Sequence, residues 1–489
     1  GKLNTIGSLT MDAKEITQTN ANILSGNGIS ITADRIRAEN STIAGNGDIS
    51  VTSKHALAIE KSTVQSGKNL SIRAGSMALT GNLSSGKDMA LTIGRSPNNT
   101  AAADFFGNIH ADGNLTAKIQ GTVSNKGTIT SNHALHLTAA NNLVQSETGK
   151  IYGKNLSLQA ANLINQGLVQ TDSAVEIKMA QVKNDATGRI YSDGISLSAA
   201  ELYNDGKIIS SRNAAFHADR ILGSGTFGSG ISPSGKLNTI GSLTMDAKEI
   251  THQNANILSG NGISITADRI RAKNSTIAGN GDISVAAKGH LGIDKTTVQS
   301  GKNLSIRAGS MPLTGNLSSG KDMALTIGRS PNNTVAADFF GNIHSDGNLT
   351  AEIQGTVSNK GTISANEALR LTATGNFVQD KDGITAGKHL SLQTANLTNK
   401  GLVQADELLE IKTAQFKNTA TGRIYGDGIS IDSAELESDG KIISSRNAAF
   451  RADRIVGSGT FGSGISPSGK LNTIGSLTMD AKEITQTNA

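Results

Sequence analysis

The sequence predicts an all-β fold, a parallel β-helix solenoid with about 20–21 residues per turn and about 23 turns. Apolar and small polar residues alternate in short triplets, as in Ile-Ser-Ile at residues 29–31, and a period of two is typical of a strand with one buried face. The triplets recur at a nearly constant spacing, and pairs such as Asn27-Gly28 between them suit sharp corners. Such short strands bury little alone, so we expect them to stack as successive turns.

The triplets define the turns one by one. Their spacing is nearly constant, except for two longer intervals, from Met89 to Leu115 and from Phe216 to Leu243, that indicate insertions. Eleven turns complete a unit, which extends from position 1 to position 234. The triplets start at Leu9, Ile29, Ile49, Leu70, Met89, Leu115, Leu135, Leu156, Val175, Ile195 and Phe216, and the series restarts at Leu243.

Further apolar residues lie between the triplets, for example Ile36 and Ile43, and they predict about three short strands per turn. The inward Ile, Leu, Val and Ala side chains of successive turns then form one continuous core. We also expect asparagines near the corners to form side-chain ladders along the axis, namely Asn69, Asn155 and Asn162.

A longer repeat encloses these turns. The opening segment, Gly1 to Ala21, recurs unchanged at Gly469 to Ala489 and almost unchanged from Gly235. The sequence therefore predicts three segments: a first β-helix super-repeat at 1–234, a second at 235–468 and the start of a third at 469–489.

The composition limits the function. The 489 residues include 10 phenylalanines, 4 tyrosines, no tryptophan and no cysteine, which disfavours an ordinary enzyme and excludes disulfides. Basic and acidic residues are interspersed at a formal net charge of +5, so we expect no nucleic-acid partner. No apolar run approaches about 18 residues, so we expect a soluble, unprocessed chain without a membrane span. We also expect no cofactor.

A short motif carries a family resemblance. It appears as Asn162-Leu163 with Asn165, Gly167 and Leu168, as Leu202 with Asn204, Gly206 and Ile208, and as Asn396-Leu397 with Asn399 and Gly401. The chain resembles the filamentous haemagglutinin family of two-partner-secreted exoproteins, including the stalks of contact-dependent inhibition proteins. This resemblance implies a right-handed β-helical filament, exported unfolded through an outer-membrane two-partner secretion transporter and folded at the cell surface of a Gram-negative bacterium.

The expected function is a repetitive structural shaft of a secreted surface filament. It would mediate adhesion to host cells, other bacteria or surfaces through reach and multivalent contacts with a receptor or glycan. A further candidate partner is a second filament, by lateral self-association. Within the family, the alternative function is the stalk of a contact-dependent inhibition toxin. From other classes, a polysaccharide-degrading β-helix enzyme and a trimeric phage tail fibre stay open.

The first insertion, Arg95 to Gly107, and its copy, Arg329 to Gly341, together hold four of the ten phenylalanines. Two adjacent rings cannot both point into a strand of period two. We expect this loop to fold over the solenoid and bury both rings; the alternative leaves one ring exposed as an adhesive contact. The candidate contact residues are Arg95, Phe105, Phe106, Arg329, Phe339 and Phe340.

The second insertion, Gly223 to Gly235, and its copy, Gly457 to Gly469, are rich in glycine and serine. We expect a simple loop-out from the solenoid, to which Phe227 and Ile231 can pin the chain. A flexible hinge is the alternative.

Few polar residues suggest chemistry. His110 and His344 recur at equivalent positions, each beside a single aspartate, Asp112 or Asp346, and we expect solvated turns there rather than metal ligands. We expect no enzyme, because short turns leave little material to wall a cleft. The carboxylate pairs considered for catalysis are Glu176 with Asp193 and Glu201 with Asp219.

Cations occur in nearly every turn, alternating with acids. We expect ordinary solubilising charge, with capture of anionic glycans as the alternative. The examples are Lys54, Arg73, Lys87, Lys126 and Arg189.

Overall fold

The computed structural model describes residues 1–94, 102–232, 235–328, 336–466, 470–471 and 474–487, and these residues are all-β with no helix. Their strands pair in parallel as a β-solenoid of about 22 turns, which confirms the predicted fold with about one turn fewer. The chain forms two compact units, Gly1–Met245 and Asp246–Ala489.

The strands of the two units are as follows. The first unit holds β1 (Lys2–Thr5), β2 (Leu9–Thr19), β3 (Asn22–Ser25), β4 (Ile29–Glu39), β5 (Thr42–Gly45), β6 (Ile49–Glu60), β7 (Thr63–Ser66), β8 (Leu70–Leu79), β9 (Asn82–Ser85), β10 (Met89–Ile93), β11 (Ala102–Phe105), β12 (Asn108–Ala111), β13 (Leu115–Ile119), β14 (Thr122–Asn125), β15 (Thr128–Ala139), β16 (Asn142–Gln145), β17 (Lys150–Gln159), β18 (Asn162–Asn165), β19 (Leu168–Thr171), β20 (Ala174–Lys178), β21 (Gln181–Asn184), β22 (Arg189–Ser192), β23 (Gly194–Asn204), β24 (Lys207–Ser210), β25 (Ala214–Gly223) and β26 (Thr226–Ser229). The boundary between the units falls within β27 (Leu243–Gln253). The second unit holds β28 (Asn256–Ser259), β29 (Ile263–Lys273), β30 (Thr276–Gly279), β31 (Ile283–Asp294), β32 (Thr297–Ser300), β33 (Leu304–Leu313), β34 (Asn316–Ser319), β35 (Met323–Ile327), β36 (Ala336–Phe339), β37 (Asn342–Ser345), β38 (Leu349–Ile353), β39 (Thr356–Asn359), β40 (Thr362–Ala373), β41 (Asn376–Gln379), β42 (Ile384–Asn399), β43 (Leu402–Ala405), β44 (Leu408–Asn418), β45 (Arg423–Gly426), β46 (Gly428–Ser438), β47 (Lys441–Ser444), β48 (Ala448–Gly457), β49 (Thr460–Gly462) and β50 (Leu477–Gln486).

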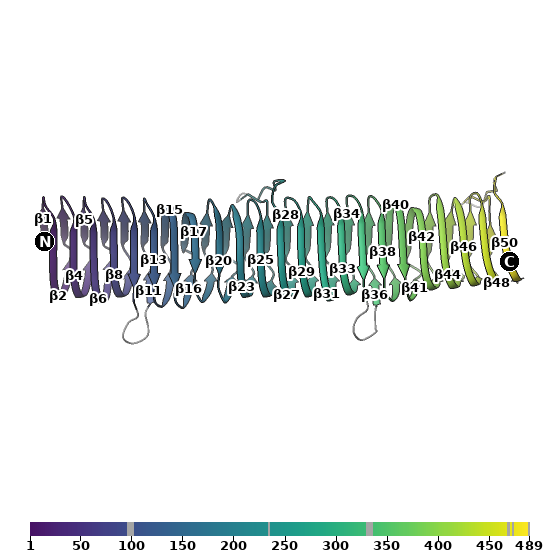
Figure 1. Cartoon of the computed structure of the whole chain (residues 1–489), viewed down its shortest axis with the longest axis horizontal. Helices are drawn as coiled ribbons and strands as arrows, with labels where there is room; N and C mark the ends of the chain where they lie inside the picture. Colours follow the sequence, from purple (N-terminus) through teal and green to yellow (C-terminus); the bar gives the residue numbers. More distant parts are fainter. Residues whose placement is uncertain (95–101, 233–234, 329–335, 467–469, 472–473, 488–489) are drawn as a thin grey trace. The chain divides into compact units, whose positions relative to one another are not determined.

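Three strands make one turn, as predicted. In the turn that starts at Leu115, β13, β14 and residues 128–131 of β15 follow one another, and we call their sides the first, second and third faces. Each strand pairs in parallel with the same face of the neighbouring turns, so that β13 lies between β10 and β15, and β14 lies between β11 and β16. Figure 1 shows these strands stacked side by side within each unit.

The backbone register on the first face follows the predicted triplets. Leu115 lies opposite Met89, across the first insertion, so the added residues leave the ladder unbroken. One triplet is misplaced, because Ile195 lies opposite Ala214 rather than Phe216. The prediction is wrong by two positions there, since two alanines occupy the preceding positions and alanine alone does not mark a strand.

Inward aliphatic side chains form a dry core in each unit. Ile31 and Leu158 are 1% and 2% exposed, whereas Ser71 lies half-buried on the outward side. Burial of one such aliphatic side chain contributes roughly 1.5–3 kcal/mol. Repetition of that modest contribution in every turn stabilises the stack.

Each unit also buries a column of side-chain amides. The Nδ2 of Asn165 donates to the Oδ1 of Asn184 at 2.7 Å, and all of both side chains is shielded from solvent. In the second unit Asn399 donates to Asn418 at 2.9 Å in the same way. Because neighbouring turns are one strand spacing apart, each amide meets the next along the axis.

The asparagines predicted to form ladders behave differently from one another. Asn69 donates from its backbone and its side chain to Asp48 at 3.0 and 2.9 Å, and Asn162 donates to Asn142 at 2.9 Å, so ladders form at both positions. Asn155 is exposed and lies opposite an alanine. The prediction is wrong for Asn155, because the neighbouring alanine has no polar side chain to pair with it.

The second insertion is smaller than predicted and is fixed to the solenoid. Of the predicted range Gly223–Gly235, Gly223 ends β25 and residues 226–229 form β26. The chain then reverses through an antiparallel bridge between Ile231 and Leu237. Phe227 and Ile231 are 0% and 4% exposed, so they pin the hairpin as the sequence suggested. The hinge stays a prediction.

The first face continues across the matching insertion of the second unit. Ala448 on β48 lies opposite Leu477 on β50, and the N–H of Ala448 donates to the carbonyl of Ser476 at 2.9 Å. The start of the third copy therefore stacks on the second copy, but the register differs by two positions from the predicted one, which would place Phe450 opposite Leu477.

Candidate contact surfaces

The predicted contact loop ends on one buried and one exposed phenylalanine. Phe105 is the last residue of β11, lies opposite Leu79 and Asn125, and is 0% exposed. Phe106 follows at the corner, where its N–H donates to the carbonyl of Leu79 at 2.8 Å, and 45% of it is exposed. The corner breaks the alternation of the strand, so the second ring points away from the core.

A lysine one turn further along covers the exposed ring. The Nζ of Lys126 lies 4.6 Å from the ring centroid of Phe106, and the Nζ of Lys360 lies 4.7 Å from that of Phe340. A cation over an aromatic face at an exposed site contributes about 0.5–1 kcal/mol. The two copies therefore present the same surface pair, which we call the Phe–Lys pair.

The expectation that both rings are buried is wrong. Phe339 is 1% exposed and Phe340 is 48% exposed, so one ring in each copy faces solvent. Arg95 and Arg329 lie outside the described residues. The sequence did not single out Lys126 as a neighbour of the ring, although Lys126 follows Phe106 by one turn length. The contact role of these residues stays a prediction.

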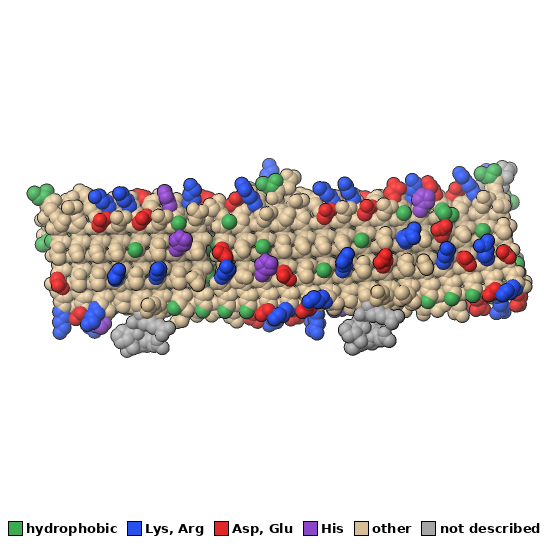
Figure 2. All heavy atoms as spheres, viewed as in Figure 1, with side chains coloured by type: hydrophobic (Ala, Val, Ile, Leu, Met, Phe, Trp, Pro, Cys, Tyr) green, Lys and Arg blue, Asp and Glu red, His purple; other side chains and the backbone are tan. Residues whose placement is uncertain are grey.

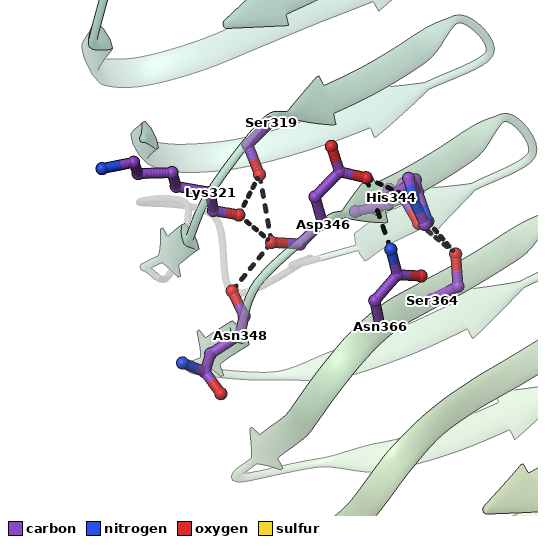
Figure 3. Close-up of polar contacts among 9 residues, drawn as sticks. Ser319, Lys321, His344, Asp346, Asn348, Ser364 and Asn366 are labelled. Atoms are coloured by element: carbon purple, nitrogen blue, oxygen red, sulfur yellow. Dashed lines mark hydrogen bonds and ion pairs between the residues drawn. The ribbon is translucent and has the colours of Figure 1, made fainter. Parts of the chain in front are cut away.

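Histidine, aspartate and a hydroxyl form a repeated cluster on the third face (Figure 3). The Nε2 of His344 lies 3.1 Å from the Oδ1 of Asp346, and its Nδ1 lies 2.8 Å from the Oγ of Ser364 on the next turn. His110 and Asp112 repeat the first contact at 3.0 Å, and His110 meets a threonine hydroxyl at 2.8 Å. The cluster thus links two adjacent turns in each copy.

The histidine cluster has too few ligands for a metal. In the part of the chain that the structure describes, no group of three or more His, Asp or Glu side chains is placed to hold an ion. The remaining neighbour, Asn366, donates to Asp346 at 3.4 Å (Figure 3).

Three of the four carboxylates considered for catalysis lie beside cations. Glu176 lies 2.6 Å from Lys178, and Asp193 lies 3.2 Å from Arg212. Glu201 and Asp219 line the same surface hollow of about 510 Å³, where Arg220 lies 3.1 Å from Glu201. These contacts are surface ion pairs between oppositely charged side chains.

Charged side chains of both signs mix on the surface. On the face that Figure 2 shows, lysines and arginines alternate with acids in each unit. Lys417 and Glu437 lie 2.8 Å apart across one turn, and this contact raises the pKa of Lys417. Exposed pairs of this kind contribute little to stability, because solvent screens their charges. Lys54, Arg73, Lys87 and Arg189 are exposed, as expected.

Among the described residues, no helix has the length and apolar character that a membrane crossing requires.

The register, the stacked turns and the repeated surface pairs together define a β-solenoid built from tandem repeats. The chain belongs to the haemagglutinin-repeat family. The sequence model of this family matches residues 5–60, 63–104, 107–146, 153–226, 239–293, 296–350 and 341–459. This assignment confirms the family that the asparagine and glycine motif predicted.

Two curated relatives are similar to the chain. "Toxin CdiA" of Escherichia coli is 24% identical over 480 residues, which cover 94% of this chain and 14% of that protein. "16S rRNA endonuclease CdiA" of Enterobacter cloacae subsp. cloacae is 26% identical over 249 residues, 50% of this chain and 6% of that protein. The chain therefore spans a small part of these relatives. No solved structure matches it significantly.

Proposed function

We propose that this chain is a section of the shaft of a protein secreted to the surface of a Gram-negative bacterium. The observation that supports this most strongly is the constant register: in both units the ladder continues across the insertions, as Leu115 opposite Met89 and Ala448 opposite Leu477 illustrate. Turns that stack in one register within a unit convert sequence length into physical length.

The mechanism of such a shaft is geometric. At about 4.8 Å per turn, the eleven predicted turns of one unit add roughly 50 Å of stack. The Phe–Lys pair recurs once per unit and provides equivalent contact points, so weak adhesive contacts add by avidity. Absence of cysteine suits export of an unfolded chain through an outer-membrane transporter, which is the proposed secretion partner.

The spacer role is tested by changing the number of units. A chain with one additional copy of residues 235–468 is expected to be longer by roughly 50 Å in electron micrographs. An unchanged length, or a second globular body, would overturn the proposal.

The adhesive role needs a separate measurement. Beads coated with the chain are expected to attach to host or bacterial cells, and Phe106→Ala with Phe340→Ala is expected to reduce attachment. Phe106 and Phe340 are outside the core, so circular dichroism should be unchanged. Equal attachment by this variant would remove the Phe–Lys pair from the proposal and leave the spacer role intact.

A toxin stalk is the second candidate, because both curated relatives carry names of toxic proteins. In this case the shaft presents an effector instead of an adhesive tip. Replacing the matching segment of the Escherichia coli toxin with this chain is expected to preserve growth inhibition of neighbouring cells. Deletion of the same segment provides the control, and loss of inhibition in both would contradict the candidate.

A further inference from the structure

Two of the four tyrosines of the chain lie in one row on the third face of the first unit. Tyr152 on β17 and Tyr191 on β22 are half-buried at outward positions, and Gln170 on β19 lies opposite both in the backbone register. We call these three residues the tyrosine row. Two strand spacings, about 9.6 Å, separate the two tyrosine backbones, which is close to the length of two linked pyranose rings.

A row of cations runs beside the tyrosine row on the same strands. In register order it contains Lys150, Arg189 and Lys207, and Leu168 lies between Lys150 and Arg189. Lys150, Arg189 and Lys207 are exposed, and we call these three residues the cation row. Among the described residues, no carboxylate oxygen lies within 4.0 Å of their charged nitrogens. Their charges are therefore available to an external anion.

An acidic acceptor lies at the edge of this surface. The hydroxyl of Tyr152 donates to the Oδ2 of Asp172, an exposed residue just after β19. This bond holds the ring in place and leaves the other carboxylate oxygen as an acceptor. Between the two rings, the amide of Gln170 supplies both donor and acceptor groups.

We propose that this surface binds an acidic polysaccharide lying along the stacking direction of the turns. Its pyranose faces pack on the tyrosine row, its carboxylates meet the cation row, and its hydroxyls bond to Gln170 and Asp172. Tyrosine and arginine suit such a contact because they combine a rigid apolar or planar surface with polar groups. The inference rests on the proposed adhesive role and adds to it a surface that is separate from the Phe–Lys pair.

A single-stranded nucleic acid would share the stacking and the cations. It carries a phosphate at every residue, however, and the carboxylate of Asp172 beside Tyr152 repels phosphates. A polyuronate also carries a charge on every ring, but each ring has free hydroxyls, and one of them can donate to Asp172. The observed mixture of three cations and a carboxylate acceptor therefore favours the polysaccharide.

The second unit carries only half of this surface. The positions equivalent to Lys150 and Tyr152 are occupied by Ile384 and Ala386. Gln404, Tyr425, Arg423 and Lys441 retain the remaining positions, in the same register. Because a single ring and two cations remain, we expect the first unit to bind and the second unit not to bind.

Isothermal titration calorimetry of the full chain with oligogalacturonate tests the proposal. We expect one site per chain and a fall in affinity of about tenfold or more for Tyr152→Ala with Tyr191→Ala. Lys150→Gln with Arg189→Gln should produce a similar fall and a weaker salt dependence. The matched variant in the second unit, Tyr425→Ala with Arg423→Gln, should leave the affinity within about twofold.

A gain of binding provides the sharper test. Ile384→Lys with Ala386→Tyr rebuilds the missing half in the second unit and should raise the stoichiometry from one to two.

Carboxyl-reduced oligosaccharide should bind weakly, as should polyglutamate, which has charge without sugar rings. Wild-type affinity of the tyrosine variant, equal binding of polyglutamate or oligo-dT, or no binding of oligogalacturonate would each overturn the inference. None of these results alters the length expected of a shaft, so the two proposals fail separately.

Discussion

The Nδ2 of Asn184 donates to the Oδ1 of Asn204 at 2.8 Å, and both side chains are fully shielded from solvent. The same Nδ2 lies 3.2 Å from the carbonyl of Gly188 at the neighbouring corner. An unpaired amide in this position would be far more destabilising than an unpaired amide on the surface, because water cannot replace the missing partner. The column therefore fixes the register of successive turns as well as their stability.

Replacing one amide of the column should destabilise the turns on both sides of it. We expect Asn184→Leu to lower the local free energy of opening by about 2–3 kcal/mol, because Asn165 loses its acceptor and Asn204 loses its donor. Hydrogen exchange of β18 and β23 measures the effect, since repeat proteins open locally. Asn162→Leu, which removes a partly exposed bond to Asn142, should change exchange there by less than about 1 kcal/mol.

A charged side chain should destabilise the fold at the inward positions of a triplet and should be tolerated at the outward position. Ile31→Asp or Leu158→Asp is expected to destabilise its region by several kcal/mol, roughly 3 or more, because a carboxylate enters the dry core. Ser71→Lys should be tolerated, because Ser71 lies on the outward side. Limited proteolysis of the three variants compares them, and equal sensitivity would refute the assignment of the two sides.

Glycines at one column of corners should not be replaceable by any residue with a side chain without loss of stability. A Cβ on Gly127 would overlap the carbonyl oxygen of Gly107 in the turn below. Gly127→Ala must therefore shift backbone, and we expect a loss of about 2 kcal/mol or more in local stability by hydrogen exchange. Gly94→Ala is the control, since its nearest atom would be 3.7 Å away. Similar effects of both substitutions would contradict a steric cause.

The phenol of Tyr152 should lose its proton at a higher pH than an ordinary tyrosine. Its hydrogen bond to the carboxylate of Asp172 raises its pKa above the ordinary value of 10.0. Because the pKa of Tyr152 is raised in the folded state, the hydrogen bond to Asp172 makes its full contribution to stability below pH 10.0. This contribution is lost as the pH rises through the raised pKa.

Ultraviolet absorbance as a function of pH measures this titration. The difference between the wild type and Tyr152→Phe isolates the phenol of Tyr152, and Asp172→Asn is expected to move that difference curve to lower pH. An identical curve in Asp172→Asn would exclude the carboxylate as the cause.

Repetition made the fold predictable from sequence. A constant separation between apolar triplets determines the turn length and the pairing partners at once, and Leu115 opposite Met89 shows that even the first insertion could be placed correctly. The error at Phe216 arose because Ala214 starts the strand, and a small side chain in the narrow core gives no alternating signal.

The contact surfaces were harder to predict, because they depend on residues of different turns. Phe106 was identified as a candidate, but its partner Lys126 becomes visible only when the sequence is wound at the period of the triplets. The buried column was missed for a related reason. Asn184 and Asn204 occupy inward positions where an apolar residue is the default expectation, and only their alignment along the axis explains how both are satisfied.

The continuous register at Ala448 and Leu477 bears on how such a protein can change over generations. Unequal recombination between near-identical gene segments deletes or duplicates whole units. A product that gains or loses one whole unit keeps the seam of Ala448 and Leu477, so under the proposed shaft function its length changes without a compensating point mutation.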